Sequence, residues 1–254
     1  MGLVQDCLRA WRIYKSPYLL ATETGFDHAE VRRVLTSAGT QRLPPTPLED
    51  QAIATRVPIT DLTEVLALRL LRQERPEIVL PYPRVFHKDT PSTQHHGIDL
   101  LGYFEAEHAF VLVVCEVMAS AEERHPPSTV RQHWRQMVAE TLDAPTPSRR
   151  LAADLDTLID ESGDEHQAVL AGFLVALLED RLGQEEHPVL ALPILVRPSA
   201  IWSDDDRGPF ARGREKLDRL AIPARLWFAG VELDRRFSEL LDLVKSTASH
   251  GQAG

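Results

Sequence analysis

The stretch that decides the fold is Phe110–Ala119, whose sequence is FVLVVCEVMA. Its first part is an unbroken apolar run, which is typical of a central strand covered on both faces of a sheet. Glu116 follows that run, and a carboxylate inside such a strand costs free energy unless it is paired or binds a cation. The stretch therefore predicts a layered fold with a buried acidic group in its sheet.

Further strands and helices flank this stretch. Apolar runs predict strands at residues 78–86, 96–104, 189–196 and 224–231. Apolar positions three to four residues apart predict helices at residues 60–75, around 130–141, twice within 151–183, and at 212–220 and 234–244. This order predicts an α/β (α+β) fold in which helices flank a mixed central sheet.

Two features of the pattern bear on organisation. Proline clusters at residues 43–47 and 144–148 predict loops, and the first divides an N-terminal appendage, residues 1–45, from a main domain, residues 46–254. The segment 165–182 is apolar nearly all round. Because it is short and ends in charged residues, we expect a helix in the core rather than in a membrane.

The composition narrows the functional classes. The chain has 28 Lys and Arg against 38 Asp and Glu, a net charge of −10, which argues against bulk electrostatic attraction to nucleic acid. Its two cysteines exclude a disulfide framework and are typical of a reducing compartment. No window approaches the roughly 18 apolar residues that span a bilayer. We therefore expect a cytoplasmic protein with no membrane contact.

Two carboxylates are predicted to meet in the sheet. Asp99 lies in the run HHGIDLLG, residues 95–102, and Glu116 lies on the next strand. Adjacent antiparallel strands bring these positions to one end of the sheet, and alternation puts Glu116 and Met118 on one face. Asp99, Glu116 and the carbonyl of Val117 are hard oxygen ligands suited to Mg²⁺ or Mn²⁺.

These residues resemble the motif of the PD-(D/E)xK nuclease superfamily. That motif has an acidic residue on a leading helix, Gly-x-Asp on the second strand and Glu-x-Lys on the third, which correspond here to Glu64, Gly97-Ile98-Asp99 and Glu116-Val117-Met118. HGIDLLG (residues 96–102) and LPIL (192–195) look like the nuclease subunit of Hachiman antiphage defence systems. The resemblance implies a restriction-endonuclease-like fold and a magnesium-dependent DNA nuclease. It also implies a helicase partner that delivers the DNA.

Met118 departs from this motif, because it stands at the position of the catalytic lysine. In the superfamily that lysine helps deprotonate the attacking water, and positioned proton transfer is worth about a hundred- to ten-thousand-fold in rate. Two explanations of this departure stay open. Either Lys88 reaches the attacking water from the preceding strand and replaces the missing lysine, or the methionine is an introduced replacement for lysine. The alternative of another class is a degenerate nuclease fold that serves as a binding or regulatory subunit.

The remaining candidates each have a second interpretation. Glu64 is either an outer ligand or organiser of the metal site or, with Asp61, part of a capping box. Lys88 and His96 either border the cleft or belong to a polar loop. Gln132 and Gln136 either face the groove from their helix or lie on its solvated side.

The nuclease hypothesis predicts a definite geometry. The carboxylates of Asp99 and Glu116 should lie on one face, roughly 4–6 Å apart, so that one cation bridges them. Glu64 should approach from the same side, with Gln132 or Gln136 at the rim. The side chain of Met118 should point into this cleft. Carboxylates on opposite faces, or a Met118 packed in the core away from solvent, would defeat the nuclease assignment.

Overall fold

The computed structural model describes residues 59–83, 98–143, 149–214, 216–240 and 242. The chain divides into two compact units, and most of these residues belong to the unit that comprises Leu66–Arg84 and His96–Phe237. The described residues of the other unit are 59–65, 238–240 and 242. The predicted appendage, residues 1–45, lies outside the described part, so its boundary stays a prediction.

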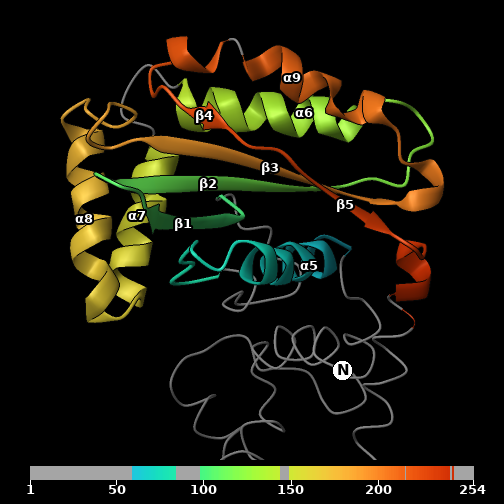
Figure 1. Ribbon diagram of the computed structural model, residues 1–254, viewed down its shortest axis with the longest axis horizontal. Helices are drawn as coiled ribbons and strands as arrows, with labels where there is room; N and C mark the ends of the chain where they lie inside the picture. The colour runs from blue at the N-terminus through green and yellow to red at the C-terminus, as the bar shows by residue number, and fades with distance from the viewer. Residues whose placement is uncertain (1–58, 84–97, 144–148, 215, 241, 243–254) are drawn as a thin grey trace, which may run out of the picture. The chain divides into compact units, whose positions relative to one another are not determined.

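The larger unit is built on a mixed sheet, as predicted (Figure 1). Strand β1 (Leu100–Glu105) is antiparallel to β2 (Phe110–Ala119), and β3 (Val189–Pro198) is parallel to β2. Strands β4 (Arg225–Leu226) and β5 (Ala229–Leu233) pair in parallel with successive parts of β3. The bounds of β2 confirm the predicted strand. Strand β3 is buried along its whole length, as a central strand should be.

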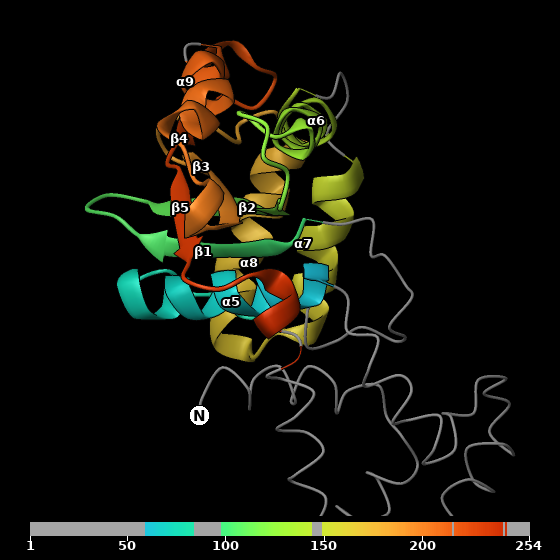
Figure 2. The same cartoon turned by 90° about the vertical axis from the view of Figure 1, so that its right-hand side faces the viewer.

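Helices flank this sheet. The described helices are α5 (Ile59–Glu74), α6 (Ser128–Met137), α7 (Arg149–Glu161), α8 (Asp164–Leu178) and α9 (Gly208–Arg214). A π-helical turn, Val138–Leu142, extends α6. Three 3₁₀ turns follow β3: Ser199–Ile201 (η3), Asp204–Arg207 (η4) and Leu217–Arg219 (η5). Helix α6 lies across the sheet from residues 66–74 of α5, while α7 and α8 pack against each other (Figures 1 and 2).

The main core lies on the α6 side of the sheet. Side chains of β2 alternate between the two faces, so Leu112, Val114 and Met118 share one of them. These three residues pack in one apolar cluster with residues of α6, α7 and α8, among them Val130, Trp134, Leu155 and Phe173. By the same alternation, Glu116 lies on this face.

Some predicted elements are shorter than expected. Within the described part of the strand predicted at 78–86, only Val79 is paired, through a single bridge to Tyr103. Gly102 permits that approach, because a Cβ atom there would collide with the carbonyl oxygen of Val79. The helix predicted at 212–220 forms instead as α9 and η5, and the strand predicted at 224–231 is split into β4 and β5. None of the helices that the structure describes has the length and apolar character that a membrane crossing requires.

Candidate metal and catalytic site

Asp99 and Glu116 occupy one row across the sheet. Leu100 pairs with Cys115, so Asp99, one residue before Leu100, falls opposite Glu116. Directly opposed residues of an antiparallel pair project from the same face. On the other side of Glu116, its partner in β3 is Pro193, which has no backbone N–H to donate. The register thus supports the prediction that both carboxylates lie on one face.

Hydrogen bonds to backbone groups hold this end of the sheet. The N–H of Val117 donates to Asp99 Oδ2 at 2.7 Å, which ties the first carboxylate to the residue after Glu116. The N–H of Ile98 donates to Oδ2 of the buried Asp154 on α7 at 2.8 Å. Helix α7 therefore fixes the backbone that carries Asp99, and Asp99 in turn fixes the backbone of β2.

Glu116 is buried, with 8% of its surface exposed, and has two basic neighbours, His133 and Arg150. His133 Nδ1 of α6 lies 3.6 Å from Glu116 Oε1, and Arg150 Nη2 of α7 lies 3.9 Å from Glu116 Oε2. Arg150 makes a closer contact with Glu140, at 2.9 Å. Glu116 Oε2 is buried and accepts no hydrogen bond among the described residues. This oxygen is therefore the part of the site that retains acceptor capacity.

The charge of the pair affects two neighbouring groups. The Glu116 carboxylate raises the pKa of the His133 imidazole, although partial burial of the ring acts in the opposite direction. Burial raises the pKa of the Cys115 thiol well above its ordinary value, and the charges of Asp99 and Glu116 add to that effect. Cys115 is fully buried, as expected for a core residue. Both carboxylates therefore act on the same short segment of β2.

The prediction for Met118 is wrong. Its side chain shares the face of Glu116 but is only 2% exposed and packs in the main apolar cluster. A thioether has no charge to keep in water, so it fills the space between β2 and the helices. This is one of the two outcomes that would defeat the nuclease assignment, so the geometry expected of a working nuclease fails at position 118, although the register keeps Asp99 and Glu116 on one face.

Of the other predicted site residues, the structure describes the side chains of Glu64 and Gln132. Glu64 is buried on α5, but it belongs to the other compact unit, so its approach to the pair stays a prediction. Gln132 is exposed on α6. Lys88, His96 and the side chain of Gln136 lie outside the described residues.

His133, Arg150 and Asp154 are the neighbours of the site that sequence analysis missed. His133 follows Val130 by three residues and precedes Met137 by four, so it borders the buried stripe of α6. That spacing indicates that His133, rather than Gln132, lies on the side of α6 that faces the sheet. The orientation of α7, which brings Arg150 and Asp154 to the site, leaves no such mark in the sequence.

The chemistry of this donor set fits a small divalent cation. Magnesium is commonly held by one or two carboxylates, with water and substrate phosphate as its other ligands. Asp99, Glu116 and the carbonyl of Val117 offer such oxygens, and Glu116 Oε2 is a buried acceptor without a hydrogen bond. The described residues contain no cluster of three or more His, Cys, Asp or Glu side chains able to hold a metal. Substrate and solvent would therefore have to complete the coordination.

Comparisons with known proteins add no family to this description. The chain matches no model of a known protein family, and a search of curated proteins found no similar one.

Proposed function

We propose that this chain is a nuclease-like protein that binds Mg²⁺ or Mn²⁺ at Asp99 and Glu116 and hydrolyses phosphodiester bonds in DNA only slowly, because the buried Met118 stands at the lysine position. The observation that carries the proposal is the row shared by the two carboxylates, with the buried Glu116 Oε2 accepting no hydrogen bond among the described residues. A buried carboxylate with unused acceptor capacity is costly, and a bound cation offsets that cost.

The order of elements supports the finer fold assignment, a PD-(D/E)xK core. A helix, α5, precedes the bridge at Val79 and the antiparallel strands β1 and β2. Helix α6 then leads toward β3, which returns parallel to β2. This is the order that the sequence resemblance implies, with the acidic residues at the corresponding ends of β1 and β2.

The side chains around the pair have separate tasks in this proposal. The Val117 N–H orients Asp99, and Asp154 holds the backbone before it. His133 and Arg150 lie close enough to Glu116 to offset its negative charge, but beyond hydrogen-bonding distance, so they leave its lone pairs unoccupied. When bound, the cation would polarise the scissile phosphate and lower the pKa of its water.

The charge of the chain supports a division of labour with a partner. A protein with a net charge of −10 is repelled by the phosphate backbone, so it binds DNA weakly alone. The proposal therefore includes the helicase partner that the resemblance implies, and a cytoplasmic role in antiphage defence.

Met118 favours a second candidate function. With an apolar, buried residue at the lysine position, the fold lacks the proton-transfer group of the superfamily. A nuclease fold that has lost this group would serve as a binding or regulatory subunit of the same assembly. The two candidates differ in two respects: only the first requires cleavage of DNA, and a pure binding subunit need not hold a cation between Asp99 and Glu116.

Cleavage of supercoiled plasmid tests the proposal. The chain is assayed with Mg²⁺, alone and with a co-expressed helicase partner, as the natural protein and as Met118→Lys, Glu116→Gln and Glu123→Gln. We expect slow nicking by the natural chain, faster nicking by Met118→Lys, and none by Glu116→Gln. Glu123→Gln, an exposed carboxylate after β2, controls for general loss of charge. Nicking that survives Glu116→Gln, or none by the natural chain and Met118→Lys, would reject the enzyme in favour of the regulatory subunit.

A further inference from the structure

Helix α8 carries an apolar face that the described structure leaves open. The sequence predicts a helix buried on all sides, but only Leu170, Phe173, Ala176 and Leu177 are buried. Val175 is 47% exposed and Leu178 is 60% exposed. A helix that is apolar all round is normally covered on every side. The prediction of a core helix is therefore correct for one side of α8 and wrong for the other.

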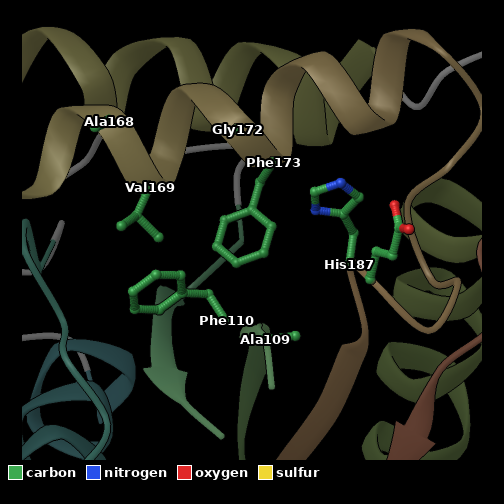
Figure 3. A pocket seen from close by; sticks show the side chains of 8 residues that line it. Ala109, Phe110, Ala168, Val169, Gly172, Phe173 and His187 are labelled. Carbon is green, nitrogen blue, oxygen red and sulfur yellow. The ribbon is translucent and has the colours of Figure 1, made fainter. Parts of the chain in front are cut away.

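A groove lies beside this face, between α8 and the start of β2 (Figure 3). Its volume is about 370 Å³, and it is lined by Ala168, Val169, Gly172 and Phe173 of α8, by Ala109 and Phe110, and at its polar end by Glu186 and His187. Phe110 is 39% exposed, although it is a large aromatic residue. A Cβ atom on Gly172 would meet nothing within 4 Å, so the groove is open at the middle of the helix.

Acidic side chains are concentrated in the segments next to this apolar surface. The segments that border it are the two ends of α8, the loop before β3 and the turn between β1 and β2. Their exposed carboxylates are Glu105, Glu107, Asp164, Glu165, Glu179, Asp180, Glu185 and Glu186. Arg181 is the one Lys or Arg in residues 105–110 and 164–187, and it pairs with Glu179 and Glu186. The surface is thus apolar at its centre and negative at its rim.

We propose that the open face of α8 and the adjoining groove dock an amphipathic helix of a partner protein, with apolar residues on one side and Lys or Arg at its flanks. Small residues at Ala168 and Gly172 let a second helix approach closely. The segment from Ala168 to Leu178 is about 15 Å long at 1.5 Å per residue, enough for three turns of a partner helix. This inference is independent of the nuclease proposal, because it uses none of the residues around Glu116.

The charge of the rim decides between possible occupants. A second copy of this chain would bring a like-charged rim against this one, which is unfavourable at an interface. Nucleic acid and anionic lipid are repelled for the same reason. A basic helix is attracted by the rim and covers the apolar centre, so it satisfies both features of the surface.

Binding of a designed helical peptide tests the proposal. The probe is a fluorescent 18-residue peptide with leucines along one face and lysines at its flanks, and its matched control has glutamates in place of the lysines. Anisotropy is measured on the full chain near physiological salt. We expect saturable binding of the lysine peptide and binding of the glutamate peptide that is weaker by about tenfold or more.

Variants of the chain locate the site. Gly172→Leu fills the groove, and Leu178→Asp places a charge on the open face. Each should weaken binding of the lysine peptide by about tenfold or more, the scale of a central contact. Glu232→Lys on β5 is the control and should bind as the natural chain does. The melting temperature of Gly172→Leu should not fall, because the added side chain enters open space.

Three results would overturn the proposal. The first is equal binding of the two peptides, or binding that is unchanged by Gly172→Leu and Leu178→Asp. The second is a concentration-dependent dimer in sedimentation that Leu178→Asp abolishes, which would make a second copy the occupant. The third is no binding of either peptide together with a lower melting temperature of Leu178→Asp, which would mean that this chain covers the face itself.

Discussion

Two of the buried carboxylates of the larger unit, Asp206 and Glu116, are held in different ways. Asp206 is fully buried in η4, and its Oδ2 accepts from Arg197 Nη1 at 2.5 Å and from the Ser203 N–H at 3.1 Å. His125 Nδ1 lies 3.0 Å from its other oxygen. Glu116 is nearly as buried, but its basic neighbours lie at 3.6 and 3.9 Å. One carboxylate is saturated with short contacts, and the other is not.

This difference separates a structural group from a candidate ligand. Short charge-assisted hydrogen bonds stabilise a buried carboxylate and occupy its lone pairs, which leaves nothing for a cation to bind. Glu116 keeps an oxygen that accepts no hydrogen bond among the described residues. Asp206 is therefore expected to contribute stability, while Glu116 is expected to contribute binding.

Asp206→Asn should give the largest effect. The substitution keeps the shape of the side chain but leaves the buried guanidinium of Arg197 without its counter-charge. Loss of one partner of a buried ion pair costs about 3–5 kcal/mol of unfolding free energy. The matched control is Asp205→Asn, an exposed neighbour in the same turn, which should cost less than about 0.5 kcal/mol. Equal urea midpoints for the two variants would remove the structural role assigned to Asp206.

Met118→Lys should have an intermediate cost. The ammonium group would enter the apolar cluster next to Glu116, and a partly compensated buried polar group costs about 1–3 kcal/mol. Met118→Leu, which keeps the position apolar, should cost less than about 1.5 kcal/mol. Urea unfolding measures both. If Met118→Lys is as stable as the natural chain, position 118 has more access to solvent than its burial indicates.

Glu116→Gln should change stability little, in contrast to Asp206→Asn. Contacts of 3.6 and 3.9 Å exceed hydrogen-bonding distance, and Arg150 retains its 2.9 Å contact with Glu140. The expected change in unfolding free energy is below about 1 kcal/mol. A loss comparable to that of Asp206→Asn would show that Glu116 is a structural group as well.

The smallest effect concerns the pH dependence of His133. Its pKa is raised in the folded chain, so its contact with Glu116 stabilises the fold fully below the ordinary imidazole pKa of 6.5. That contribution is lost as the pH rises through the raised value. His133→Gln should therefore destabilise the chain more at pH 6 than at pH 8.5 in urea unfolding. The dependence should disappear in a Glu116→Gln background, and its persistence there would assign it to another group.

The sequence was sufficient for the strands that carry the pair. An unbroken apolar run determined β2, and alternation with antiparallel pairing placed Asp99 opposite Glu116. What surrounds Glu116 depends on how α6 and α7 are oriented, which local periodicity does not encode. The same is true of Asp206, which in the sequence is only the last of three consecutive aspartates. Its burial arises because Arg197 of β3 reaches it from a strand nine residues earlier.

The sequence also did not predict which sides of helix α8 are buried. Apolar composition on all sides correctly excluded a solvated helix, but composition does not state what covers each side. The exposed Val175 and Leu178 become visible only when the packing of α7 and α8 is known.

Calorimetric titration with Mn²⁺ tests the central claim most directly. The natural chain should bind one ion in a saturable manner, and both Asp99→Asn and Glu116→Gln should abolish that binding while Glu123→Gln retains it. Such a result would establish the row formed by Asp99 and Glu116 as a cation site, whatever its catalytic rate. Absence of binding in the natural chain, or binding that Glu116→Gln leaves unchanged, would contradict the account.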